Sequence, residues 1–213
     1  MMNTMQPLIL ENAPYTLKDE AERLRRAEML TLPYMQPLVD YLASVSIRVG
    51  EAYQIPQFDP CDGGIHARAL FLLEAPGPKA RDSEFVSCNN PDPTARNLWH
   101  LINDAQISRA DLAIWNIVPW YVGEPGRIRP VTSTDIWEAL PYLRELLALL
   151  PRLEVIVLVG KKAQSAEKSL RSITCLPLMF THHMSAQVFN ITPEKKRVTQ
   201  EKFAEIAQFL REH

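Results

Sequence analysis

The stretch Leu70-Phe71-Leu72-Leu73-Glu74-Ala75-Pro76-Gly77 decides the fold expected for this chain. Its four leading apolar residues predict a buried strand of a parallel sheet. The Pro76-Gly77 pair predicts a tight turn that ends the strand. Glu74 stands between the two, at the carboxyl end of the strand, where α/β proteins place their ligands. A strand that simply emerges into solvent at Glu74 is the competing interpretation.

Three further apolar runs, at 112–115, 155–159 and 176–180, also read as strands. Helical periodicity lies between the runs, and a last helical stripe follows them. Alternating strands and helices are typical of a parallel sheet covered on both faces. The sequence therefore predicts the α/β class, a three-layer α/β/α sandwich with a central four-stranded parallel sheet.

Each predicted strand is followed, at its carboxyl end, by a residue that is suited to a binding or catalytic site. Right-handed crossovers would place these residues along one edge of the sheet. They are Glu74, Asn116, Gly160 and His183. A carboxylate, an amide and an imidazole would then meet in one cleft.

Length and composition bound the organisation. At 213 residues and 46% hydrophobic, the chain can bury one sizeable core, so a single compact domain is expected. Residues 1–50 are expected to form an N-terminal arm and helices that pack on the core, and 51–213 the α/β domain itself. The formal charge of −2 provides no global basic field, so any nucleic-acid contact needs a local patch.

The cysteines and the hydropathy indicate the compartment. Cys61, Cys88 and Cys175 are an odd count without a Cys-x-x-Cys pair, which speaks against a disulfide framework or a zinc site. No apolar run reaches about 18 residues and no stretch resembles a signal peptide. A cytoplasmic protein without membrane contact is expected.

The residues at the sheet edge suit hydrolysis of a bond whose leaving group becomes an anion. Glu74 could orient a water or stabilise a developing cation, and Asn116 could both donate to and accept from the edge of a planar heterocycle. His183 could donate to the oxygen where negative charge builds. Phe85 could stack on a flat ring. Each also has a structural interpretation: a loop cap, a turn residue, a core histidine and packing.

These residues resemble the uracil-DNA glycosylase superfamily, particularly its iron–sulfur branch, over about residues 68–210. The first motif of that branch reads Gly-Glu-Ala-Pro-Gly, and this chain has Leu73-Glu74-Ala75-Pro76-Gly77. The remaining motifs follow in the family's order, and they are similar to Phe85-Val86, Trp115-Asn116-Ile117-Val118, Arg129-Pro130-Val131-Thr132 with Pro141-Tyr142-Leu143, Val159-Gly160-Lys161-Lys162-Ala163, and His183-Met184-Ser185 with Asn190 behind it.

The resemblance implies a glycosylase that removes uracil, or a related deaminated base, from DNA as a monomer. It implies Glu74 and His183 as catalytic residues. The implied substrate-binding residues are Ala75, Pro76, Gly77, Phe85, Asn116 and Ser185. The implied DNA contacts are Lys161, Lys162, Asn190, Lys195, Lys196 and Arg197. Val188 or Phe189 could wedge into the duplex, or either could belong to the core.

Departures from the family pattern leave alternatives open. The branch holds a 4Fe–4S cluster through four Cys, but its two interior ligand positions fall near Trp120 and Ala139, so no cluster, metal or organic cofactor is expected. Leu73 replaces the first Gly of the motif, and Met184 replaces a Pro.

The short loop before Phe85 leaves Asp82 or Glu84 able to replace or assist Glu74. A catalytically weak DNA- or damage-binding protein of the same fold, and a small-molecule nucleoside hydrolase, are the alternative functions.

Overall fold

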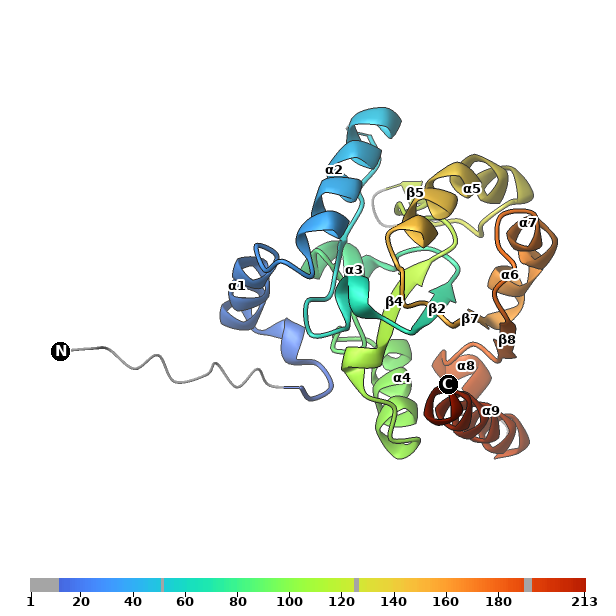
Figure 1. Ribbon diagram of the computed structural model, residues 1–213. Coiled ribbons are helices and arrows are strands. Elements are labelled where there is room, and N and C mark those ends of the chain that lie inside the picture. Colours follow the sequence, from blue (N-terminus) through green and yellow to red (C-terminus); the bar gives the residue numbers. More distant parts are fainter. Residues whose placement is uncertain (1–11, 51, 125–126, 190–192) are drawn as a thin grey trace.

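The computed structural model describes residues 12–50, 52–124, 127–189 and 193–213 (Figure 1). A four-stranded, all-parallel sheet lies at its centre, in the order β4-β2-β7-β8. The strands are β2 (Ala69–Leu73), β4 (Leu112–Asn116), β7 (Val155–Val159) and β8 (Leu178–Thr181). All four coincide with the apolar runs, so the predicted α/β sandwich with a four-stranded parallel sheet is confirmed.

The strands β2, β4 and β7 are buried because helices cover both faces of the sheet, as parallel sheets require, while the edge strand β8 is only partly buried. One face carries α2 (Gln36–Val49), α5 (Ser133–Ala148), α6 (Gly160–Ser165) and α7 (Glu167–Arg171). The other carries α4 (Pro93–Asp104), α8 (Ala186–Phe189) and α9 (Pro193–Glu212). The rings of Phe71 in β2 and Phe203 in α9 lie 5.6 Å apart, which shows how closely α9 packs on the sheet.

The helices α4 and α5 begin where a side chain satisfies their free amide groups. Asp92 accepts hydrogen bonds from Thr94 N and Ala95 N at the start of α4. Thr132 and Asp135 form a reciprocal capping box at the start of α5. These caps fix the points at which the chain leaves the sheet edge and enters a helix.

The segments before and between the main strands contain further short elements. They are η1 (Thr16–Lys18), α1 (Glu20–Met29), η2 (Gly64–His66), α3 (Pro78–Ser83), η3 (Arg109–Asp111), and two strand pairs, β1 (Gln57–Phe58) with β3 (Phe85–Val86) and β5 (Gly123–Glu124) with β6 (Arg127–Ile128). The rings of Phe58 in β1 and Trp115 in β4 stack at 3.8 Å, so the short β1–β3 ladder is anchored on the central sheet.

A buried ionic cluster joins α1 to the loop around residue 60. The Asp59 carboxylate accepts hydrogen bonds from Arg26 at 2.5 Å and from Arg109 at 2.8 Å. Asn89 Oδ1 accepts from the same two guanidinium groups. Arg26, Asp59 and Asn89 are all fully buried. The cluster therefore holds the segment around Asn89 in one position, and this segment continues into a wall of the candidate site.

No helix of the described residues has both the length and the apolar character that crossing a membrane requires.

Candidate active site

A cavity of about 580 Å³ opens at the carboxyl edge of the parallel sheet. We call it the sheet-edge cavity, and its wall includes Glu74, Ala75, Pro76, Gly77, Val86, Asn90, Asp92, Asn116, Arg129, Pro130, Lys162 and His183. Its volume is typical of sites for small ligands. The structure thus brings Glu74, Asn116 and His183 to one cavity, and this is the edge where the strand pattern predicts them.

The Glu74 carboxylate is held by the backbone of the loop that precedes α5. Its Oε1 accepts a hydrogen bond from Val131 N at 2.9 Å. The backbone carbonyl of Glu74 accepts from Val118 N at 3.1 Å, which extends the β2–β4 pairing beyond the strands. Glu74 is half-buried, so one carboxylate oxygen is fixed while the side chain still borders the cavity.

Asn116, the last residue of β4, carries an amide without a partner. The residue is 3% exposed, and its Nδ2 makes no hydrogen bond within the part of the chain that the structure describes. An unpaired buried donor is costly, so such a group calls for an explanation. Because Asn116 lines the cavity, a ligand with an acceptor atom would satisfy the amide.

The His183 ring has a defined proton position. Its Nδ1 accepts a hydrogen bond from Ser185 N at 3.0 Å. Burial lowers the pKa of His183 below its ordinary value, against the smaller, opposing effects of Glu74 and Asp92. The neutral imidazole therefore carries its proton on Nε2, which leaves an N–H donor for a ligand.

Two neighbours place the His183 loop. Gly160 has φ +81°, and a Cβ built on it would lie 2.8 Å from His183 Cβ, so a residue with a side chain does not fit there. Asn97 of α4 donates from Nδ2 to the Met184 carbonyl at 2.8 Å. Met184, which stands where the family has Pro, is fully buried. The loop is thus fixed by packing and a hydrogen bond.

Lys162 adds a cation that the sequence assigned to DNA contact. It lines the cavity, and its Nζ donates to the Val131 carbonyl at 2.9 Å. Val131 is therefore bound through its N–H by Glu74 and through its carbonyl by Lys162. Neither contact leaves a signal in the sequence, since Val131 is an ordinary apolar residue in a loop.

Phe85, predicted to stack on the base, lies outside the cavity wall. It is 2% exposed and is absent from the cavity wall, whereas its neighbours Val86 and Ser87 are part of it. Within the two-residue strand β3, which pairs with β1, the side chains of Phe85 and Val86 point to opposite sides, and only Val86 faces the cavity. Asn90 Nδ2 also donates to the Phe85 carbonyl at 2.8 Å. In this structure Phe85 does not offer its ring to a ligand in the cavity.

The acidic residues considered as substitutes for Glu74 lie elsewhere. Asp82 pairs with Arg81 at 2.7 Å and does not line the cavity. Glu84 ends α3 with φ +66° and also stays outside the cavity. Of these three carboxylates, Glu74 alone borders the cavity. The other predicted substrate-binding residues divide in the same way: Ala75, Pro76 and Gly77 line the cavity, while Ser185 contacts His183 through its backbone.

The predicted DNA contacts lie on exposed helix starts. Lys161 is exposed in the first turn of α6, and Lys195, Lys196 and Arg197 are exposed in the first turns of α9. Arg197 forms ion pairs with Glu194 and Glu201, and Lys196 Nζ lies 5.8 Å from the centre of the Phe189 ring. Phe189 is buried, which favours the core interpretation of that residue. Asn190 lies outside the described residues, as does the Val188 side chain.

The donor set does not fit the iron–sulfur cluster of the branch that the chain resembles. Trp120 and Ala139, which stand near the interior ligand positions, offer no thiolate, and both are buried. Cys88 is buried, Cys61 is half-buried and Cys175 is exposed. Burial raises the pKa of Cys61, and it raises that of Cys88 to about 12. Among the described residues no group of three His, Cys, Asp or Glu is placed to hold a metal ion.

Comparison with known proteins places this arrangement in a family. The model of the uracil DNA glycosylase superfamily matches residues 60–211. No curated protein sequence matches significantly. A solution NMR structure from Methanosarcina acetivorans, of a protein provisionally assigned as a uracil DNA glycosylase, is similar at 14% identity and a TM-score of 0.46, with 66% of this chain and 91% of that one covered. Since the family model spans well over half of its length, the chain belongs to the uracil DNA glycosylase superfamily.

Proposed function

We propose that this protein is a DNA glycosylase that hydrolyses the N-glycosidic bond of uracil, or of a related deaminated base, in DNA. The observation that carries the proposal is the Asn116 amide, buried and without a partner for its Nδ2 among the described residues, at the wall of the sheet-edge cavity. The edge of uracil offers a carbonyl oxygen next to an N–H group. An amide presents the complementary donor and acceptor pair.

Selection of the base follows from that complementarity. Asn116 Nδ2 donates to the O4 carbonyl of uracil and its Oδ1 accepts from N3–H. Cytosine presents an amino group and an unprotonated nitrogen at the same positions, so both contacts would be lost. The base reaches the cavity by leaving the DNA stack, at a cost of about a few kcal/mol that is lowest in a mispair.

Cleavage uses the two remaining groups. As the bond between C1′ and N1 lengthens, its electron pair moves into the base, and the His183 Nε2–H donates to the O2 atom where negative charge builds. The Glu74 oxygen that Val131 does not hold stabilises the cationic sugar and accepts a hydrogen bond from the attacking water. The products are the free base and an abasic site.

The basic residues hold the DNA backbone. We assign phosphate contacts to Lys161, Lys162, Lys195 and Lys196 and, from the family resemblance, to Asn190 and Arg197. Each contact of this kind makes binding weaker at higher salt. The exposed lysines at the starts of α6 and α9 support this assignment.

A catalytically weak damage-binding protein is the second candidate. Two observations favour it: Phe85 does not line the cavity, and the departures Leu73 and Met184 stand within the family motifs. Such a protein would bind the same lesions and leave the glycosidic bond intact.

The test is an excision assay on labelled oligonucleotides that carry U·G, U·A, single-stranded uracil, hypoxanthine or xanthine, with alkali to cleave abasic sites. Glu74→Gln, Asn116→Ala and His183→Ala are compared with wild type. Asp82→Asn and His182→Ala are the matched controls, because these side chains carry the same chemistry outside the cavity.

The proposal expects wild type and both controls to cut, and the three cavity variants to lose most of their activity. Binding of uracil-containing DNA without cleavage would favour the damage-binding candidate. Absence of both binding and cleavage by folded protein at low salt would rule out both, and would leave a nucleoside hydrolase to be tested on free nucleosides.

A further inference from the structure

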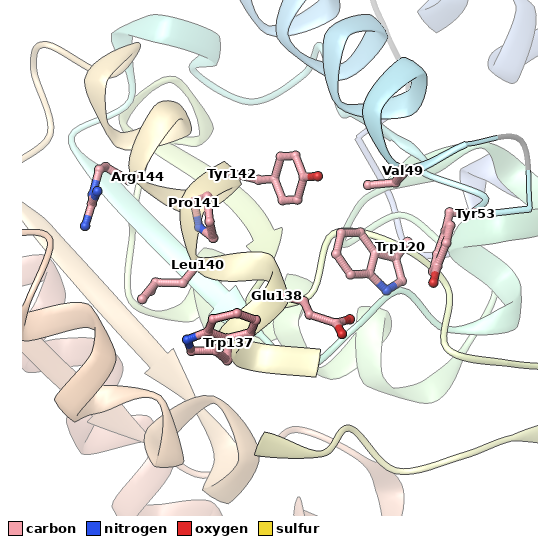
Figure 2. A pocket seen from close by; sticks show the side chains of 9 residues that line it. All are labelled: Val49, Tyr53, Trp120, Trp137, Glu138, Leu140, Pro141, Tyr142 and Arg144. Atoms are coloured by element: carbon pink, nitrogen blue, oxygen red, sulfur yellow. The ribbon is translucent and has the colours of Figure 1, made fainter. Parts of the chain in front are cut away.

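A second cavity, of about 530 Å³, lies between the end of α2, the segment around Tyr53 and helix α5 (Figure 2). We call it the aromatic cavity. The residues of its wall that matter here are Tyr53, Trp120, Trp137, Glu138, Tyr142 and Arg144. The function proposed above uses none of them.

The aromatic rings offer exposed faces on a rigid support. Trp137 is 73% exposed and Tyr53 is 42% exposed. Behind them, the buried Trp120 contacts Tyr53 edge to face, with ring centres 5.2 Å apart, and contacts Tyr142 in the same manner at 5.9 Å. Several aromatic rings gathered in the wall of one cavity are typical of a site for a ligand with a flat, apolar face.

Two opposite charges border the same cavity. Within the described part of the chain, neither Glu138 nor Arg144 has an ion-pair or side-chain hydrogen-bond partner. Figure 2 shows Glu138 on the side of Trp120 and Tyr53, and Arg144 at the other end beyond Leu140. A carboxylate accepts from an amino group on a ring edge, and a guanidinium binds phosphate. Rings, carboxylate and guanidinium together match the parts of a nucleotide.

Residues of the aromatic cavity lie next to residues that line the sheet-edge cavity. Arg129 lines the sheet-edge cavity and pairs with Asp135 in the first turn of α5 at 2.6 Å. The hydrogen bond to Asp135 raises the pKa of Arg129, and the nearby Tyr53 and Glu138 of the aromatic cavity raise it further. Trp120 and Val122, two residues apart, line the aromatic and the sheet-edge cavity respectively. The two cavities therefore border the same stretch of chain, residues 120–122, and lie on either side of the Arg129–Asp135 pair.

We propose that the aromatic cavity binds an unpaired nucleotide of the DNA strand whose target base occupies the sheet-edge cavity, with preference for a base that carries an exocyclic amino group. The inference rests on the proposed function. Trp137 and Tyr53 stack on the base, Glu138 accepts from its amino group, and Arg144 binds a phosphate. A cationic partner would match Glu138 and the rings, but it would be repelled by Arg144 and Arg129.

The test measures binding of undamaged, labelled single-stranded oligo-dA, oligo-dC and oligo-dT by fluorescence anisotropy. Trp137→Ala should weaken binding about 5- to 150-fold, the range expected for one stacked base. Trp137→Phe keeps a ring and should restore most of the affinity. Leu24→Ala, which changes an apolar residue 60% exposed on α1, is the control and should bind as wild type does.

Glu138→Gln supplies the second measurement. Wild type should bind oligo-dA and oligo-dC more tightly than oligo-dT, and the variant should lose much of this difference. If wild type excises its base but Trp137→Ala binds every oligonucleotide as tightly as wild type, the inference is overturned while the proposed function stands. The inference would also be overturned if the wild type bound an arginine-rich peptide rather than DNA and Trp137→Ala lost that binding. If no oligonucleotide binds and no base is excised, both proposals fail together.

Discussion

Replacement of Gly160 by Ala tests whether the cavity depends on close packing at the start of α6. The backbone there has φ +81°, which costs a residue with a Cβ about 1–2 kcal/mol. The new Cβ would also lie 2.8 Å from His183 Cβ. Ordinary contact lies several tenths of an ångström further out, so His183 must move.

The two effects have different magnitudes and different measurements. The backbone term should lower the melting temperature by about 2–8 °C, read by calorimetry or circular dichroism. The displacement of His183 should lower the single-turnover excision rate about tenfold or more, because a shift of about 1 Å in a reacting group can cost about a hundredfold.

Gly50→Ala separates these effects. Gly50 also has a positive φ, at +89°, but a Cβ there would meet nothing within 4 Å. This variant should also lose stability, since its φ is positive, but it should keep its excision rate. If Gly160→Ala also excises at the wild-type rate, the argument that Gly160 is required by the position of His183 is refuted.

Three further outcomes follow from the charges. Because the pKa of His183 is lowered, its neutral form should persist as the pH falls to 6.5. A pH–rate profile should therefore be flat down to that value and decline only below it. The free energy of unfolding should also decline below pH 6.5, since the unfolded chain then binds the proton before the folded chain does. Asp59→Asn should cost about 3–5 kcal/mol in urea unfolding, because two buried guanidinium groups lose their shared carboxylate, and a cost under about 1 kcal/mol would contradict that account. In DNA-binding titrations Lys196→Ala should reduce the slope of log affinity against log salt by about 1, whereas Arg197→Ala, whose charge is already paired with Glu194 and Glu201, should change it less.

The sheet could be predicted because its strands are continuous apolar runs. Val155–Val159 and Ala69–Leu72 are buried on both faces of the sheet, so each of their consecutive residues is apolar and the run is visible in the sequence. The residues after the strands share one edge for the same topological reason, and this placed Glu74, Asn116 and His183 in one cavity.

The direction of Phe85 could not be predicted in this way. It depends on whether β3 pairs with β1, and a two-residue strand is too short to show a period. The ionic cluster escaped prediction for a related reason. Arg26 and Asp59 are 33 residues apart in the sequence. A charged residue in a helix with many other charged residues is predicted to face solvent, unless the buried partner that pairs with it is known.

The aromatic cavity was present in the sequence only as scattered rings. Trp120 stands near a position where the branch that the chain resembles has a cluster ligand, and Trp137 lies within the helical periodicity that follows Ser133. In the structure Trp137 is 73% exposed. Helical periodicity identifies the stripe that faces the core, but it does not distinguish a ring at the edge of the stripe from one inside it.

The double hold on Val131 has a consequence for how mutational effects combine. Glu74 binds its N–H and Lys162 binds its carbonyl, and α5, which carries Trp137 and Glu138, begins two residues later. Substitution of either Glu74 or Lys162 would remove one of the two hydrogen bonds that hold Val131 and would free part of this loop. Substitution of the other residue would then remove a hydrogen bond from a loop that is already less ordered. The free-energy costs of the two changes should therefore not add, and a double-mutant cycle would assign the difference to the coupling between an acid and a base that share one residue.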